Sequence, residues 1–130
     1  MRRINARLIA VAALVLLILQ VTSVAAAPRR IRIKHGHTSA RVKGRLRNIH
    51  DDANFVLRAR AGQHLKVTIN GQGPTRGAVT SPGGQPIGGG PGGVVFDDNL
   101  PATGDYRIRV TESQMADEWK GTFILKVNVH

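Results

Sequence analysis

The chain has 130 residues, no cysteine and a formal net charge of +11. The lack of cysteine excludes disulfides, so a folded domain of this size must be held by its hydrophobic core alone. The excess of 19 Lys and Arg over 8 Asp and Glu attracts polyanions at a distance.

Residues 1–26 are predicted to be a secretory signal peptide. Three arginines precede an apolar run from Leu8 to Leu19, and small residues follow it. That run is shorter than the roughly 20 residues that a membrane-spanning helix needs, although an uncleaved signal anchor is the alternative. Cleavage is expected after Ala25 or Ala26. Residues 27–130 are a stretch of one domain's size, expected as a secreted or periplasmic protein without a stable membrane span.

Two basic strands are expected at the start of the mature chain. Ile31 and Ile33 alternate with basic residues, as do Val42 and Leu46. If both segments are strands, their basic side chains lie opposite the aliphatic ones, and pairing brings the charges within about 5–8 Å. A solvated face that discourages aggregation is the simpler explanation. The alternative is a polyanion-binding face made of Arg30, Arg32, Lys34, Arg41, Lys43, Arg45 and Arg47.

Residues 54–69 show the strongest pattern in the chain. Period-two alternation of apolar and polar residues occurs on both sides of a break at Gly62-Gln63. This pattern predicts a β-hairpin with one buried face and one mostly basic face.

The remaining sequence also favours short strands. A glycine-rich tract from Gly71 to Gly93 interrupts the alternation, with a short strand expected at 78–80 and a turn at 81–84. Extended segments are expected at 94–96, 106–110 and 123–129. No window of the mature sequence shows clear helical periodicity, and a helical turn or two at 112–119 is the one alternative. The sequence therefore predicts an all-β fold: a single antiparallel β-sandwich of about seven to eight short strands over residues 27–130.

The turns carry a resemblance to known families. Gly-Gln at 62–63, Pro-Gly at 82–83 and Leu-Pro-Ala-Thr-Gly-Asp-Tyr at 100–106 resemble bacterial pre-peptidase C-terminal (PPC) domains, which are small, jelly-roll-like β-sandwiches. Lys34-His35-Gly36-His37-Thr38-Ser39-Ala40 followed by Val42-x-Gly44 is similar to the periplasmic inhibitors of goose-type lysozyme. This resemblance spans essentially the whole mature chain and implies a lysozyme as the partner.

The chain departs from the inhibitor family at one connection. The resemblance implies that a key-like loop before the last strand enters the lysozyme cleft, with arginines contributing. Residues 111–119 of this chain contain no arginine and three acids. These acids have the right sign to approach a basic lysozyme, and large apolar side chains stand among them, as partner anchors or as plugs on the core. We therefore expect a partner to be contacted by Glu112, Gln114, Met115, Asp117, Glu118 and Trp119.

Other chemistry is disfavoured. No serine lies in a nucleophile context and no acids are spaced as an acid/base pair, so an enzyme is not expected. His35 and His37 with His50 are a weak metal candidate, and Asp97 and Asp98 with Asp105 lack the ligand array of a calcium loop. No metal or cofactor is therefore predicted. Few aromatic residues are free for stacking, which argues against nucleic acid.

These observations favour a non-enzymatic periplasmic or secreted binding protein that occludes goose-type lysozyme. The alternatives are a PPC-like module that binds an anionic envelope glycan through its basic sheet face, and an accessory structural domain with no dedicated ligand.

Overall fold

The computed structural model describes residues 28–113 and 119–130, and several strands of these ranges alternate between core and solvent. The nine strands of this part are β1 (Arg29–Ile31), β2 (Ser39–Leu46), β3 (Asp52–Ala59), β4 (His64–Gly71), β5 (Thr75–Thr80), β6 (Pro86–Pro91), β7 (Gly93–Asn99), β8 (Gly104–Glu112) and β9 (Gly121–Val129). None of the described residues forms a helix of the length and hydrophobicity that crossing a membrane requires.

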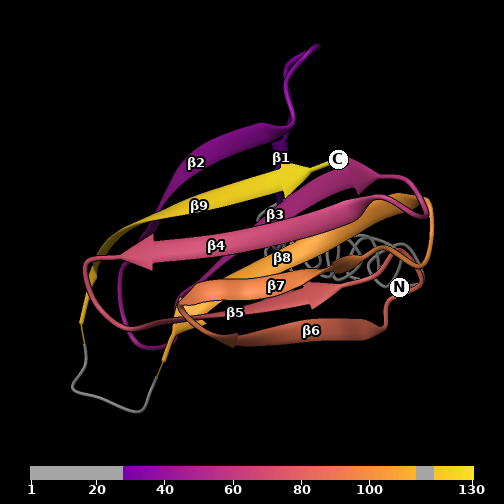
Figure 1. Ribbon diagram of the computed structural model, residues 1–130. Coiled ribbons are helices and arrows are strands. Elements are labelled where there is room, and N and C mark those ends of the chain that lie inside the picture. The colour runs from indigo at the N-terminus through magenta and orange to yellow at the C-terminus, as the bar shows by residue number, and fades with distance from the viewer. Residues whose placement is uncertain (1–27, 114–118) are drawn as a thin grey trace, which may run out of the picture.

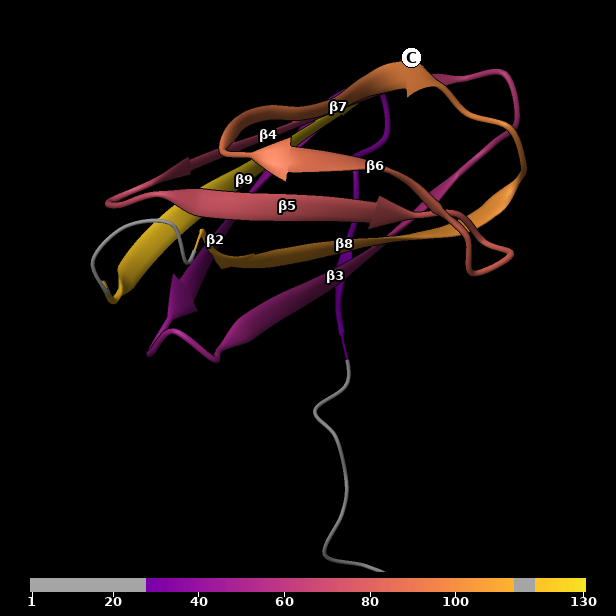
Figure 2. The same ribbon diagram turned by 90° about the horizontal axis from the view of Figure 1, so that it is seen from below.

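The strands form two facing sheets, as Figures 1 and 2 show from two directions. One sheet has five strands in the order β1-β3-β8-β5-β6, and the other has four in the order β2-β9-β4-β7. All pairings are antiparallel except that of β1 with β3. The predicted all-β sandwich is confirmed, with nine strands in the described ranges rather than seven or eight.

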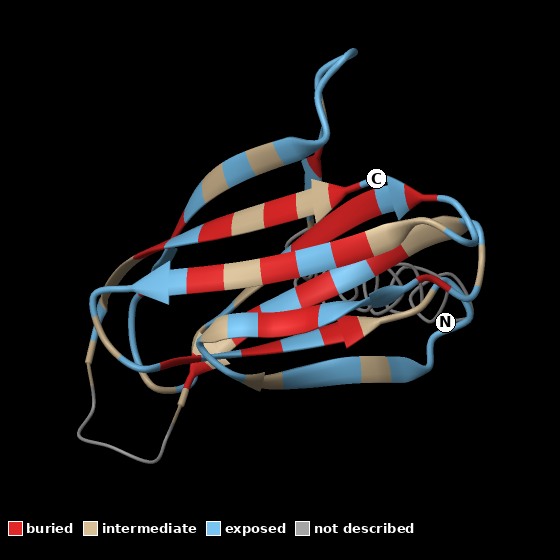
Figure 3. Ribbon diagram, viewed as in Figure 1, coloured by how far each residue is buried: buried red, intermediate tan, exposed pale blue. Residues whose placement is uncertain are grey.

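The core lies between the sheets and receives every second side chain of the central strands, seen as alternating bands in Figure 3. Phe55 of one sheet meets Phe123 of the other edge to face, with ring centroids 6.2 Å apart. The apolar residues at alternate positions of the expected extended segments are all buried: Phe55, Leu57, Leu65, Val67, Ile69, Tyr106, Ile108, Val110, Phe123, Leu125 and Val127.

The prediction of a hairpin at 54–69 is wrong. β3 pairs with β1 and β8, whereas β4 pairs with β7 and β9, so residues 60–63 cross from one sheet to the other. The Gly62 N–H donates to Leu100 O at 2.9 Å, and the Leu100 N–H donates to Gln63 O at 2.8 Å. The two strands therefore bury their aliphatic side chains in the same core from opposite sides, which gives the same alternation as a hairpin.

The glycine-rich tract is more ordered than its composition suggests. β5 and β6 form a hairpin around the expected turn at 81–84, where the Gly84 N–H donates to Ser81 O at 2.9 Å. Gly88 lies in β6 opposite the Phe96 ring, where an added methyl group would lie 2.6 Å from a ring carbon. Glycine thus allows the edge strand β6 to lie close over the core.

Candidate protein-binding site

Three connections, residues 47–51, 72–74 and Gly92, gather at one end of the sandwich with the described flanks of a fourth, Ser113 and residues 119–120. They join β2 to β3, β4 to β5, β6 to β7 and β8 to β9. In Figure 1 the end of β4 and the start of β9 lie on the same side of the molecule. Residues 114–118 are outside the described part of the chain, so Gln114, Met115, Asp117 and Glu118 remain predicted contact residues.

The two flanks of the β8–β9 connection are held at one backbone atom. The Ser113 N–H donates to Pro74 O at 3.1 Å, and Trp119 Nε1 donates to the same oxygen at 2.8 Å. The chain therefore leaves β8 and returns to β9 at the same point on the β4–β5 connection.

Trp119 packs against the core instead of standing free in the solvent. Its indole ring covers Gly73, where an added methyl group would lie 2.6 Å from a ring carbon. The Trp119 N–H also donates to Glu112 Oε1 at 3.3 Å. Of the two roles expected for this side chain, the structure favours the plug, which fixes the base of the connection.

Glu112 is a correction to the predicted site. It was expected to offer its charge to a partner, but it is the last residue of β8, points inward and is only 2% exposed. The buried carboxylate accepts the hydrogen bond from the Trp119 N–H and so helps to hold the start of β9. It is not available for a contact on the surface.

A second pair of hydrogen bonds, between Gln72 and Thr122, ties the β4–β5 connection to the start of β9. The Gln72 N–H donates to Thr122 O at 3.1 Å, and the Thr122 N–H donates to Gln72 Oε1 at 3.0 Å. A shallow hollow of about 370 Å³ opens next to it, between the ends of β4, β5 and β6 and Ser113. This end therefore combines a fixed base with a recessed, glycine-rich surface.

The predicted basic face is divided between the two sheets. Arg30 belongs to β1 in the five-stranded sheet, whereas Arg41, Lys43 and Arg45 belong to β2 in the other. β1 and β2 do not pair, because each joins the edge of a different sheet. The expected single face of Arg30, Arg32, Lys34, Arg41, Lys43, Arg45 and Arg47 is therefore wrong, although all seven side chains are exposed.

The acids considered for calcium are also dispersed. Asp97 on β7 contacts His64 Nε2 at 2.5 Å, and Asp105 on β8 forms an ion pair with Arg30 at 3.1 Å. The two strands belong to different sheets. Within the described ranges no three His, Cys, Asp or Glu side chains are grouped to hold a metal ion.

Two ionisable groups outside the connections are shifted by their neighbours. Hydrogen bonds with Asp97 and Asn99 raise the pKa of the half-buried His64 side chain. A bidentate hydrogen bond from Arg30 lowers the pKa of Asp105.

No protein-family model matches the chain, and no curated protein matches it. Several solved structures match it. PliG of Aeromonas hydrophila, a periplasmic inhibitor of g-type lysozyme, is 26% identical with a TM-score of 0.70, covering 79% of this chain and 96% of that protein.

Two more distant structures show the same fold. PliG of Salmonella Typhimurium, also a periplasmic inhibitor of g-type lysozyme, is 17% identical with a TM-score of 0.63. The PPC domain of a Bacillus anthracis collagenase is 14% identical with a TM-score of 0.63. Each match covers 82% of this chain and 100% of the other. The resemblance drawn from the sequence is thereby confirmed in structure: the chain has the sandwich fold that PliG inhibitors of g-type lysozyme and PPC domains share.

Proposed function

We propose that this protein is a non-enzymatic periplasmic inhibitor of g-type lysozyme. The observation that carries the proposal is the likeness to Aeromonas hydrophila PliG, which extends over 96% of that inhibitor at 26% identity. The similar proteins are periplasmic lysozyme inhibitors, in agreement with the predicted signal peptide. The sequence itself offers no nucleophile context and no acid/base spacing.

The β8–β9 connection is the part that we propose to contact the lysozyme. Loops at the end of a rigid sandwich are the usual position for binding residues, since the strands are occupied with core packing. Here both flanks meet at Pro74 O, which limits the conformational entropy lost on binding. Asp117 and Glu118 supply negative charge toward a basic lysozyme. Trp119 holds the start of β9 against the β4–β5 connection and so positions the loop that precedes it.

Reversal of the two loop charges tests this assignment. Asp117→Lys combined with Glu118→Lys should weaken inhibition of goose-type lysozyme about tenfold or more, a loss of about 1.4 kcal/mol or above. The control is Asp97→Lys combined with Asp98→Lys on β7, which changes the net charge equally at the opposite end of the sandwich. Equal inhibition by the loop variant and the parent, with both folded by circular dichroism, would remove the loop from the interface.

Trp119 provides a graded second test. Trp119→Phe keeps a ring over Gly73 but loses the hydrogen bond to Pro74 O, whereas Trp119→Ala loses both. We expect inhibition to fall in the order parent, Trp119→Phe, Trp119→Ala, measured as the concentration that halves the rate of cell-wall lysis. An alanine variant as potent as the parent would show that the base need not be fixed.

A further inference from the structure

The outer face of the five-stranded sheet concentrates arginine. Outward positions of its strands and the residue after β1 carry six exposed arginines and two acids. These are Arg30, Arg32, Arg58, Arg76, Arg107, Arg109, Asp52 and Asp105. The alternations Arg58-Ala-Arg60 and Arg107-Ile-Arg109 are visible in the sequence, but they lie outside the basic face predicted at residues 30–47.

Strand register brings these charges together. Arg30, Val56 and Arg107 occupy one row across β1, β3 and β8, and Arg58 and Asp105 are partners in β3 and β8. Neighbouring strands are about 5 Å apart. Val56 points outward yet is only 6% exposed, because arginine stems beside it cover apolar surface while their guanidinium groups stay in water.

The two acids balance only part of this charge. Asp105 pairs with Arg30 at 3.1 Å, and Asp52 pairs with Arg109 at 2.9 Å. Arg32, Arg58, Arg76 and Arg107 form no ion pair with any described residue. Arg58 and Arg107 also contribute to lowering the pKa of Asp105. The negative charge of Asp105 therefore interacts with three arginines, of which Arg30 alone is its ion-pair partner.

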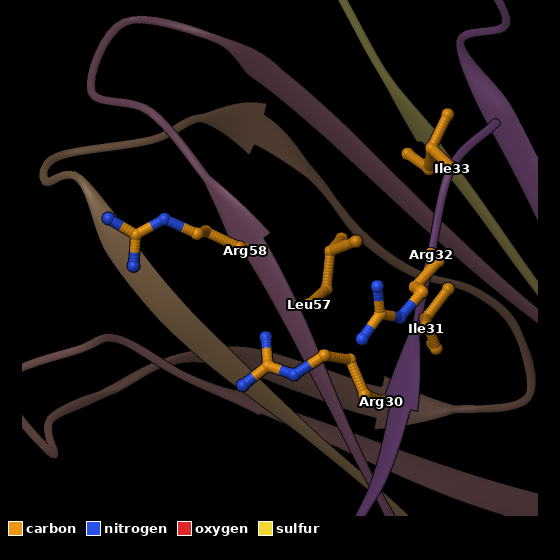
Figure 4. Close-up of a pocket in the computed structure, with 6 residues that line it drawn as sticks. All are labelled: Arg30, Ile31, Arg32, Ile33, Leu57 and Arg58. Atoms are coloured by element: carbon orange, nitrogen blue, oxygen red, sulfur yellow. The ribbon is translucent and has the colours of Figure 1, made fainter. Parts of the chain in front are cut away.

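A groove runs along one side of this face. It has a volume of about 410 Å³ and is lined by Ile31, Ile33, Leu57 and three arginines. It opens where the pairing of β1 with β3 ends, at Ile31 and Leu57. Figure 4 shows Arg30, Arg32 and Arg58 extending in the same direction across the sheet, with Leu57 between them.

We propose that this arginine face, made of Arg30, Arg32, Arg58, Arg76, Arg107 and Arg109, binds a polymer with repeated phosphate groups. Guanidinium groups form bidentate hydrogen bonds with phosphate. Arginines at diagonal positions of neighbouring strands, such as Arg58 on β3 and Arg107 on β8, can bind successive phosphates. The exposed large hydrophobic residues of the described chain, Val94 and Ile124, lie on the other sheet. The arginine face therefore offers anion-binding groups without an apolar anchor for a bilayer, which favours a soluble polymer over a membrane surface.

Long-chain inorganic polyphosphate is the probe, titrated into the mature protein at several salt concentrations. Arg32→Gln, Arg58→Gln and Arg107→Gln together should weaken binding about tenfold or more. The slope of log affinity against log salt should become shallower by about two to three, since each lost phosphate contact removes about one. Replacement of the same three residues by lysine tests whether bidentate hydrogen bonds matter, because lysine keeps the positive charge but cannot form them. We expect an affinity between those of the parent and the glutamine triple.

The matched control replaces Arg41, Lys43 and Arg45 on β2 by glutamine, which removes three exposed positive charges from the other sheet. Binding should stay within about twofold of the parent, because these residues are not on the arginine face. Equal losses in both glutamine triples would show a response to net charge alone and overturn the proposal. Parent-like binding by the Arg32, Arg58 and Arg107 triple would overturn it as well, as would binding to phosphatidylglycerol vesicles without binding to polyphosphate.

This proposal is independent of lysozyme inhibition. The arginine face is on a sheet surface, whereas the β8–β9 connection is at an end of the sandwich. Lysis assays on the same triples should therefore show parent-like inhibition, and failure of either proposal leaves the other standing.

Discussion

Single residues at the ends of strands hold the connections of this sandwich in place. The Tyr106 hydroxyl donates to Ala102 O at 2.5 Å and accepts from the Ala102 N–H at 3.2 Å. Tyr106 is itself fully buried. One side chain thus fixes the turn at 100–103, which in turn holds the 60–63 crossing between the sheets through Gly62 and Leu100.

Tyr106→Phe should therefore destabilise the protein. The phenyl ring keeps the packing, but both backbone groups of Ala102 lose their partner, at a cost of about 1–3 kcal/mol. Urea unfolding of parent and variant measures this difference as a lower midpoint at an unchanged slope. An unchanged midpoint would show that water replaces the hydroxyl without loss.

His64 should make stability depend on pH. Its pKa is raised in the folded state by hydrogen bonds with Asp97 and Asn99, so the folded protein holds the proton more tightly than the unfolded chain. This contribution is fully present below the unfolded value of about 6.5 and is lost as pH rises through the higher folded value. The urea midpoint of the parent should thus fall over this window relative to that of His64→Gln; parallel pH profiles of the two proteins would contradict the assignment.

At the scale of strands, the sequence predicted which residues face inward but not which strands pair. Alternation reports only that one face of a strand is buried. It is the same for a hairpin and for two strands that face each other across a core, which is why residues 54–69 were misjudged. In the tract from Gly71 to Gly93 the sequence predicts only the short strand at 78–80, which lies within β5, and does not predict β6. The residues of β6 have low β propensity, while close packing on Phe96 requires glycine there.

Gly44 shows this requirement within a strand. It is buried in β2 opposite Phe123 of β9, and an added methyl group would lie within 2.8 Å of three ring carbons. Gly44→Ala should therefore cost about 1–3 kcal/mol through overpacking. Gly83→Ala is the matched control, since the nearest atom to its added methyl group is 4.0 Å away. Equal unfolding midpoints for both variants would mean that the Phe123 ring moves aside freely.

At the scale of the whole molecule, the fold class and the core followed from the sequence because both depend on local alternation. The charged surfaces did not, since they depend on which strands become neighbours. Arg30 and Arg107 are far apart in sequence and share a row only through β3. The role of Trp119 was likewise undecided until the position of Pro74 was known.

The core should behave as one unit shared by both sheets. Leu65 and Phe123 are almost completely buried, so Leu65→Ala or Phe123→Ala should each lower the free energy of unfolding by about 2–5 kcal/mol. Ile124→Ala is the control on the same strand as Phe123, because Ile124 is 44% exposed and its loss should stay within about 0.5 kcal/mol. A loss well below 2 kcal/mol for both core variants would show that the buried face is assigned wrongly.

Inhibition of lysis tests the central claim most directly. The purified mature protein is added to goose-type and hen-type lysozymes, and both binding and the rate of cell-wall lysis are measured. We expect tight binding to goose-type lysozyme with loss of its lytic activity. Undiminished lysis by goose-type lysozyme at saturating concentrations of the folded protein would contradict the proposed function.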